Sequence, residues 1–395
     1  MANAGEFHED MDCSLVLGGP LYQLLLRSRL TTPALELLAR RIGFFVLVTW
    51  GPLALLAAAG GDFLGGVAVP FLRDVNVHAK FLISLPLFIA AELIVHHRLR
   101  PAVLQFRDAG LITPEDLERF AAVIRSMWRM RNSVVAEIVM LVLAFLPGHW
   151  LWQSQTTFTG ATWYAAPANG AMHYTWAGYW YVLLSLPIVR FVILRWYFRI
   201  FIWYVLLWRV SRLSLRLNPL HPDRAGGLGF LGLAVGAFGP VLMGQTVMLA
   251  GMIGGVIWHQ GAKLTDFSAT ITACIAILLL IALAPLGFFL AKMAQARRLG
   301  LRQYDLLGGR YVHEFRQKWL AKGGPSDPQL LGSGDIQSLA DLANSYEIIR
   351  EMKTLPTDRR TLISLAAALV LPLLPLMLTM LRMEEIVRRL VKIVL

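Results

Sequence analysis

Residues 269–292, ATITACIAILLLIALAPLGFFLAK, carry no charge before the final lysine. A run of about 20 apolar residues is long enough for a helix to cross the roughly 30 Å hydrocarbon core of a bilayer. Comparable runs occur at residues 42–60, 80–97, 133–152, 176–194, 230–258 and 362–380. The sequence therefore predicts an all-α, polytopic membrane protein with about seven transmembrane helices, accompanied by amphipathic helices at the membrane interface.

The composition is that of a membrane protein rather than a soluble domain. Of the 395 residues, 56% are hydrophobic and 16% are charged, whereas soluble domains carry about 25% charged residues. The net charge of +12 fits basic loops that lie beside anionic headgroups. We therefore expect a bilayer with anionic inner-leaflet lipids as partner, and no nucleic acid. Cys13 and Cys274 lie too far apart in this topology to form a disulfide framework.

The distribution of basic residues predicts the orientation of the chain. The predicted inner loops hold 26 lysines and arginines, and the outer loops hold only Arg73, Lys80 and Lys263. Basic loops remain in the cytoplasm, so the pattern places the N-terminus there. The last span leaves two alternatives. Either it crosses fully and leaves four basic residues of the tail outside, or it turns back at Pro372 and Pro375.

The hydrophobic runs divide the chain into four regions. These are a cytoplasmic N-terminal tail with amphipathic helices (1–41), a bundle of six spans (42–292), a cytoplasmic helical insert (293–360), and the last span with an amphipathic C-terminal helix (361–395).

Two further segments are amphipathic or basic. In residues 113–132, Leu117, Phe120 and Ile124 share one helical face, which predicts a helix lying on the inner leaflet. The basic and aromatic stretch 195–216 predicts either an interfacial helix or a cytoplasmic extension of the fourth span.

Three charged side chains interrupt the apolar runs. Glu92, Glu137 and Arg190 fall at similar depth in the cytoplasmic third of the predicted bundle. Charges inside a membrane are costly and often mark an ion or solute path. Gln245, deeper in the fifth span, is a further candidate for this path. The alternative is a structural ion pair, with Arg190 extending to the interface.

The densest polar motif stands directly before the fifth span. Residues 217–230 read LNPLHPDRAGGLGF, and each proline disfavours helix at the residue before it. Gly226 and Gly227 permit close backbone approach, and exposed amides ahead of a helix attract anions. This predicts an anion-binding loop at the mouth of the path, whose other candidate residues are His221, Asp223 and Arg224. The alternative is a rigid turn that sets the angle of the fifth span.

The same residues are compatible with a metal site. Glu92 and His96 are separated by one helical turn, a spacing that can ligate a metal, and His221 and Asp223 would complete a set of nitrogen and oxygen ligands. The predicted ligands of a divalent metal are therefore His96, His221 and Asp223. The alternative is that His96 and His97 form a polar girdle at a helix end.

Two segments carry a resemblance. NPLHPDRAGGLG (218–229) and GDIQSLADL (334–342) resemble segments of bacterial multi-spanning membrane proteins. The resemblance implies a bacterial inner-membrane location, and it implies no activity, substrate or site.

Three functions remain open from the sequence. The first is binding or conduction of a small solute or ion through the polar cluster near the cytoplasmic face. The second is a membrane-embedded, metal-dependent enzyme with a site on that face. The third is a sensor or scaffold that recruits a partner through residues 293–360. A homo-oligomer is compatible with all three.

Overall fold

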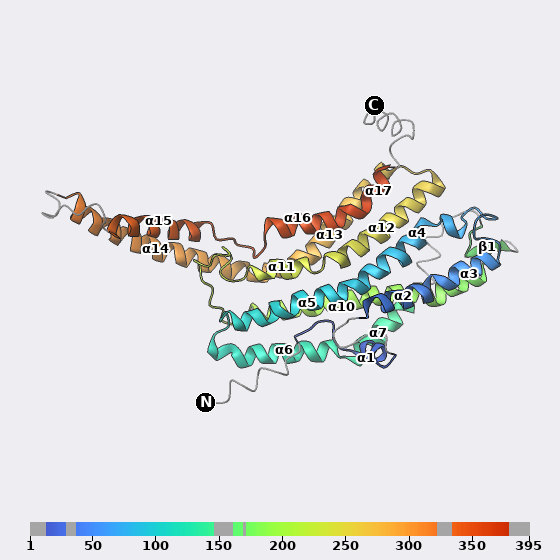
Figure 1. Cartoon of the computed structure of the whole chain (residues 1–395), viewed down its shortest axis with the longest axis horizontal. Helices are drawn as coiled ribbons and strands as arrows, with labels where there is room; N and C mark the ends of the chain where they lie inside the picture. The colour runs from blue at the N-terminus through green and yellow to red at the C-terminus, as the bar shows by residue number, and fades with distance from the viewer. Residues whose placement is uncertain (1–12, 29–36, 146–160, 169–170, 322–333, 379–395) are drawn as a thin grey trace, which may run out of the picture.

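The computed structural model describes residues 13–28, 37–145, 161–168, 171–321 and 334–378. Its helices form one elongated bundle (Figure 1). An antiparallel pair, β1 (Ala165–Ala168) and β2 (Ala171–Tyr174), stands at one end, which we call the strand end. At the opposite end α14 (Leu290–Trp319) and α15 (Gly334–Arg350) project as a helical hairpin, which we call the arm.

The bundle is built from helices that are joined by turns and, as between α10 and α11, by longer loops. In chain order they are α1 (Pro20–Arg27), α2 (Leu38–Thr49), α3 (Gly51–Ala59), α4 (Val75–His78), α5 (Leu85–Asp108), α6 (Leu117–Arg131), α7 (Val134–Phe145), α9 (Trp176–Trp180), α10 (Leu186–Val210), α11 (Phe230–Gly236), α12 (Gly239–Gln260), α13 (Ser268–Leu283), α16 (Arg359–Val370) and α17 (Leu374–Met377). Short stretches of 3-10 helix lie at η1 (Phe71–Arg73), η3 (Pro114–Asp116), η5 (Leu264–Phe267), η6 (Ala284–Phe289) and η7 (Leu371–Leu373). Two π-helical segments, η2 (Ala79–Ser84) and η4 (Tyr181–Ser185), connect α4 to α5 and α9 to α10.

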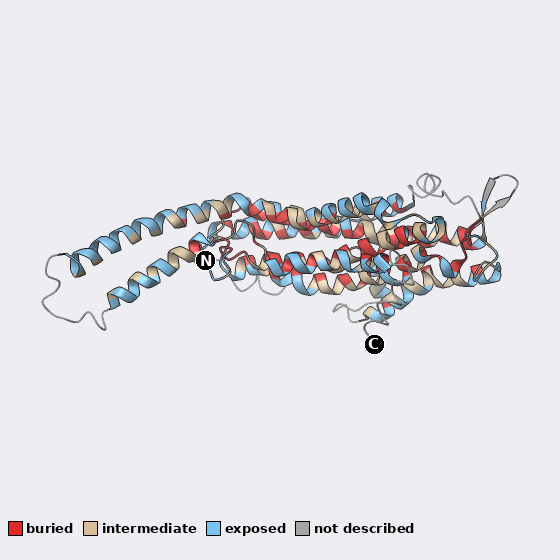
Figure 2. Cartoon of the chain, turned by 90° about the horizontal axis from the view of Figure 1, so that it is seen from above, coloured by how far each residue is buried: buried red, intermediate tan, exposed pale blue. Residues whose placement is uncertain are grey.

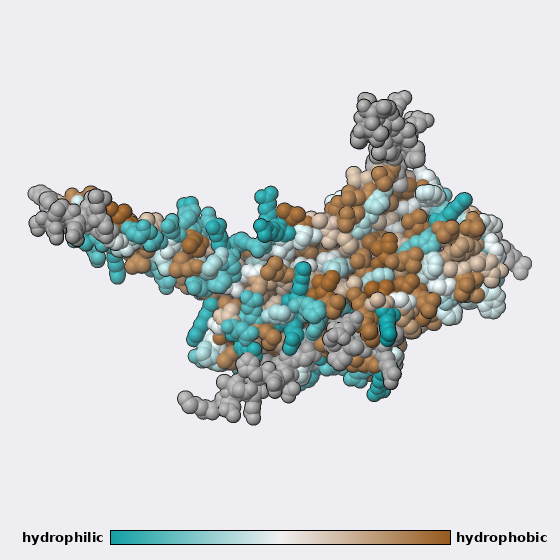
Figure 3. Space-filling model, viewed as in Figure 1, coloured by the Kyte–Doolittle hydropathy of each residue, from teal (hydrophilic) through white to brown (hydrophobic). Residues whose placement is uncertain are grey.

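Long apolar helices confirm a helical, multi-pass membrane protein. Within the described residues, six continuous helices are long and apolar enough to cross a membrane: Leu38–Ala59, Val75–Asp108, Trp176–Val210, Phe230–Gln260, Leu264–Trp319 and Arg359–Met377. The predicted third span corresponds to α7, which has 12 residues, and the rest of that span lies outside the described residues. Hydrophobic side chains cover much of the bundle surface, whereas the arm is mostly hydrophilic (Figure 3).

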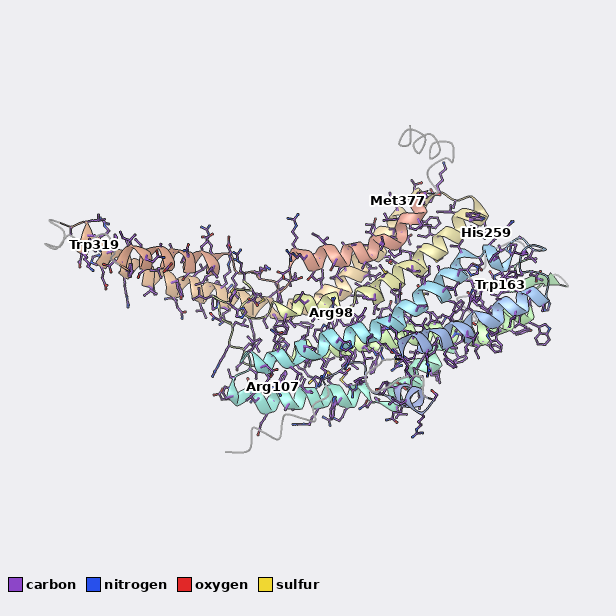
Figure 4. All side chains as sticks on the ribbon, in the orientation of Figure 1. Arg98, Arg107, Trp163, His259, Trp319 and Met377 are labelled. Carbon is purple, nitrogen blue, oxygen red and sulfur yellow. The ribbon has the colours of Figure 1, made fainter. Side chains whose placement is uncertain are left out.

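The last span runs along one side of the bundle. It lies beside α11 and α12, so that a Cβ on Gly232 would stand 3.0 Å from the Thr357 Cα, and one on Gly254 would stand 3.3 Å from the Leu376 Cδ2. Its last described turn, at Met377, lies toward the same half of the bundle as His259, and Trp163 lies farther along at the strand end (Figure 4). The helix therefore does not turn back at its two prolines before Met377. The predicted C-terminal helix lies outside the described residues.

The amphipathic helix α6 packs on protein. Its apolar side chains Phe120, Ile124 and Met127 are buried in the same core as Trp203 and Leu206 of α10. The physical reason is the length of α10. The continuous helix that contains it has 35 residues, and about 20 suffice to cross the hydrocarbon core, so its far end presents apolar surface that α6 covers.

The arm extends beyond the bundle. The helix that begins at Leu264 continues to Trp319 over 56 residues, which is about 84 Å at 1.5 Å per residue. Buried residues gather along the bundle, and the arm is largely exposed (Figure 2). Residues 195–210 continue the helix of the fourth span, because α10 runs without a break to Val210. The side of the membrane on which this extension lies stays a prediction.

Candidate functional site

Buried charged side chains from three helices meet near the middle of the bundle. The Arg41 Nη1 on α2 and the Arg199 Nη2 on α10 both pair with Glu92 on α5, at 2.6 Å and 2.8 Å from its two carboxylate oxygens. The Arg199 guanidinium also lies over the ring of Trp196, 4.8 Å from its centroid. The Trp196 indole in turn donates to the Phe88 carbonyl at 3.0 Å. Glu92 is thus held between two arginines whose positions are fixed by packing.

A second carboxylate extends this group. Arg195 lies one helical turn before Arg199 and therefore on the same face of α10. Its Nη2 stands 3.9 Å from the Glu137 Oε1 of α7. The other Glu137 oxygen accepts the backbone N–H of Leu21 at 2.9 Å. We call Arg41, Glu92, Glu137, Arg195 and Arg199 the arginine cluster.

The arginine cluster carries an excess of positive charge. Three guanidinium groups share two carboxylates, which leaves one positive charge uncompensated within the cluster. Arg41 is 1% exposed, yet its Nε and Nη2 have no hydrogen-bond partner among the described residues. Buried donors of a charged group are rarely left unpaired, because the desolvation cost is then uncompensated.

A small cavity adjoins the Arg41 side chain. It has a volume of about 20 Å³ and is lined by Arg41, Glu92, Arg195 and Arg199 together with apolar side chains. A polar space of at least about 10–15 Å³ can hold one water-sized occupant. The cavity therefore has room for a single water-sized occupant beside the Arg41 guanidinium.

The segment before α1 covers the arginine cluster. Ser14, Leu15 and Val16 are almost completely buried. The Ser14 carbonyl accepts from the Arg131 Nη1 at 2.5 Å, and the Gly19 N–H donates to the Asn132 side chain at 3.0 Å. Residues predicted to form a cytoplasmic tail thus form part of the packed core.

The structure brings together two of the three predicted intramembrane charges. Glu92 and Glu137 both belong to the arginine cluster, bridged by α10. Arg190 pairs with neither, and its buried Nη1 has no hydrogen-bond partner among the described residues. Gln245 lies on α12, and its Nε2 is likewise buried without a partner in the described chain.

The glycine loop before α11 encloses a carboxylate of the chain itself. The Asp223 Oδ1 accepts the N–H groups of Ala225 and Gly227 at 2.8 Å and 3.2 Å, and the Oδ2 accepts that of Gly229 at 2.8 Å. The His221 Nδ1 lies 2.8 Å from the Oδ1. Amides that the sequence predicted as an anion site therefore bind Asp223, which favours the rigid turn.

This loop joins the bundle to the arm. Arg224, with φ of 52°, pairs with Glu351 at 2.5 Å, and its carbonyl accepts the Lys353 N–H at 2.7 Å. The loop packs beyond the end of α5, where a Cβ on Gly227 would meet Leu111 at 3.0 Å. Glu92 lies sixteen residues before that helix end, or about 24 Å along its axis. The structure therefore does not place the loop over the arginine cluster.

Loss of the Asp223 carboxylate is expected to loosen this junction. Burial opposes its ionisation, but the N–H groups of Ala225, Gly229 and Gly227 outweigh burial and lower the pKa of Asp223. A lowered folded-state pKa stabilises the fold above the unfolded value of about 3.9, and this contribution is lost as the pH falls through the folded pKa. At neutral pH, Asp223→Ala should cost about 1–3 kcal/mol, because three partly buried N–H donors lose their acceptor.

The measurement is the free energy of unfolding in mixed micelles at pH 7. Asp305→Ala is the matched control, since Asp305 is exposed on α14 and its removal should change stability by at most about 0.5 kcal/mol. Equal values for the two variants would contradict a structural role of the Asp223 turn.

The predicted metal ligands are not gathered in one place. His96 shares a 2.8 Å hydrogen bond with the Ser14 hydroxyl and lies edge-on to His97, whereas His221 and Asp223 belong to the distant loop. Among the described residues, no group of three or more His, Cys, Asp or Glu side chains could hold a metal ion.

Sequence reasoning missed all three basic residues of the cluster. The sequence places these residues, Arg41, Arg195 and Arg199, near the inner ends of spans. A basic residue at a span end usually lies beside lipid headgroups, so no site was inferred from them. A usable signal was the i, i+4 spacing of Arg195 and Arg199 within an uninterrupted apolar helix. Comparisons of the chain with protein-family models, with curated proteins and with solved structures gave no match.

Proposed function

We propose that this membrane protein binds and conducts a small inorganic anion, such as chloride, through the arginine cluster. The observation that carries the proposal is the pair of unpartnered, buried Arg41 nitrogens beside a water-sized cavity. An anion in that cavity would accept hydrogen bonds from these nitrogens and neutralise the excess positive charge. A cation would meet three guanidinium groups and two carboxylates that are already paired.

The magnitude of the electrostatic effect supports an anion. An uncompensated charge in a low-dielectric interior is costly, and arginine does not lose its proton to escape that cost. The remaining solution is a counter-charge or water in the cavity. Because the cavity holds only one water-sized occupant, a halide fits better than a polyatomic anion such as phosphate.

The proposed orientation places the arm in the cytoplasm of a bacterium, in the inner membrane. The support comes from charge: α14 carries six lysines and arginines after residue 292 against two acidic residues, and basic segments are retained on the cytoplasmic side. In this orientation the N-terminal segment 13–19 covers the cluster from the cytoplasmic half, and the strand end faces outward.

Chloride efflux from proteoliposomes tests the proposal. Arg41→Gln keeps much of the side-chain length but removes the charge and the two free donors. We expect chloride efflux to fall at least about tenfold, because one charge-assisted hydrogen bond contributes roughly 1.5–3 kcal/mol. The flux should follow a chloride gradient and be unaffected by replacing potassium with a larger cation.

Arg209→Gln is the matched control. Arg209 is also on α10, but its Nη1 donates to the Ser126 hydroxyl at 2.6 Å, outside the arginine cluster. This variant should retain wild-type efflux. Equal efflux from wild type and the Arg41 variant, or a flux that follows the cation instead, would refute anion conduction by this cluster.

A further inference from the structure

An open groove lies between α7 and α10. It has a volume of about 570 Å³, and its lining residues are apolar except for Glu137. On the α10 side these residues lie between Leu183 and Val192, inside the continuous helix Trp176–Val210, which is long and apolar enough to cross the membrane. The surroundings of this part of a spanning helix are lipid tails rather than water.

Both walls of the groove have the side-chain spacing of a helix-packing surface. The α7 wall repeats at i, i+4, i+7 and i+11, in Val134, Ile138, Leu141 and Phe145. The α10 side repeats at i, i+4 and i+7, in Leu184, Ile188 and Phe191. Apolar stripes of this kind are normally buried against another element. The four α7 side chains are nevertheless 49–56% exposed, so the two stripes line a space instead of closing on each other.

The first turns of α10 pack on α2 and α3. The π-helical turn η4 leads into α10, and its buried Ser185 donates to the Thr49 carbonyl of α2 at 2.7 Å. Leu186 and Val189 share a core with Leu53 of α3. Because these contacts fix one face of α10, its other face is left to line the groove.

The dimensions of the groove fit a lipid tail and exclude a helix. From Val134 to Phe145, α7 rises about 16.5 Å, close to the roughly 15 Å that one leaflet contributes to the hydrocarbon core. Dividing the volume by this length gives a mean cross-section of about 35 Å². A helix with its side chains is about 10–12 Å wide and occupies about 80–110 Å². The groove is therefore too narrow for a helix and as long as one leaflet is thick.

One end of the groove is polar and bordered by basic residues. Glu137 is already engaged there, because it accepts the Leu21 N–H at 2.9 Å and lies 3.9 Å from the Arg195 Nη2. The last turn of α6, just before α7, carries the exposed Arg129. The helix α1, which borders the groove at Leu21, ends at the exposed Arg27. Figure 1 shows α1 beside α7 at this end. Basic residues at a membrane interface attract anionic headgroups.

We propose that this groove binds one anionic phospholipid, with its phosphate beside Arg27 and Arg129 and one acyl chain running from Val134 toward Phe145. The inference does not rest on anion conduction. Lipid tails are as apolar as the groove, so close packing and headgroup charge, rather than the hydrophobic effect, retain this lipid. The bound chain covers the α7 stripe and closes the bundle between α7 and α10.

The lipid retained by the purified full chain tests the acyl-chain site. Protein is incubated in mixed micelles with equal amounts of phosphatidylglycerol and phosphatidylcholine, washed, and examined by native mass spectrometry. We expect one phosphatidylglycerol per wild-type chain. Leu141→Trp should lower this occupancy at least about tenfold, because the indole takes the space of the chain. The matched control is Leu143→Trp, since Leu143 is 43% exposed on the same helix and does not line the groove.

Two surface variants test the headgroup and keep the test valid if Leu141→Trp does not fold. Replacing Arg27 and Arg129 together with glutamine should lower the preference for phosphatidylglycerol over phosphatidylcholine at least about fivefold, since each basic residue near the headgroup adds to the attraction. The charge-matched control replaces Arg100 of α5 and Arg125 of α6, which are also exposed, and should keep the wild-type preference.

Four outcomes would overturn the proposal. The first is wild-type lipid occupancy in Leu141→Trp. The second is equal loss in both tryptophan variants, which marks lipid bound around the whole bundle rather than in the groove. The third is equal retention of the two phospholipids by the wild type. The fourth is a lipid-free dimer that dissociates in Leu141→Trp, which would assign the groove to a second copy of the chain.

Discussion

Replacing Glu92 with alanine is expected to destabilise the protein by about 3–5 kcal/mol, because it leaves two buried arginines without their shared carboxylate. Arg41 and Arg199 are 1% and 5% exposed, and both pair with Glu92 within 2.8 Å. Neither guanidinium can lose its proton, and neither can reach water unless its helix unpacks. The loss should therefore exceed that of an ordinary truncation.

The free energy of unfolding in mixed micelles measures this effect. The control is Glu351→Ala, which breaks the ion pair with Arg224 at 2.5 Å, where the two side chains are 42% and 52% exposed. A solvent-exposed pair contributes about 0–1 kcal/mol. If the two variants lost the same stability, the arginine cluster would not be a buried ion-pair network.

Gly178→Ala is expected to cost about 3 kcal/mol or more, at the upper end of overpacking effects. A Cβ at this position would stand 2.0 Å from the Tyr164 carbonyl oxygen and 2.9 Å from its carbon, and a backbone cannot yield as a flexible side chain can. That carbonyl also accepts the Thr175 N–H at 3.1 Å. Displacing it would pull the buried Trp163 away from Asp74.

Thermal unfolding in detergent measures this prediction. Gly255→Ala is the matched control, because a Cβ there meets only the Asn76 Cβ, at 3.9 Å. Alanine favours helix over glycine by about 1 kcal/mol, so this control should be neutral or slightly more stable. A Gly178 variant as stable as wild type would show that the strand end is not packed against α9.

The membrane-spanning helices could be predicted because their signal is local. Long apolar runs such as residues 269–292 satisfy their own backbone hydrogen bonds as helices, whatever lies beside them. The same reasoning did not determine which protein surface covers an amphipathic face. Phe120 and Ile124 were expected to face lipid, and they pack against α10 because that helix is longer than the membrane requires.

The candidate site depended on contacts between distant segments. Glu92 and Glu137 could be selected as unusual charges in apolar helices, but Arg41 and Ser14 join their surroundings from sequence positions far away. Only packing decides whether a basic residue near a span end turns toward headgroups or toward a carboxylate.

By itself, the sequence determined that this protein is helical and crosses the membrane several times, because hydropathy and helix length are properties of each segment alone. The tertiary structure decided which charges meet. It places Arg190 apart from the two glutamates and places three arginines around two carboxylates. It also places the Asp223 carboxylate where the N–H groups of the glycine loop donate to it. These outcomes depend on the rotation and relative height of whole helices, which no single segment encodes.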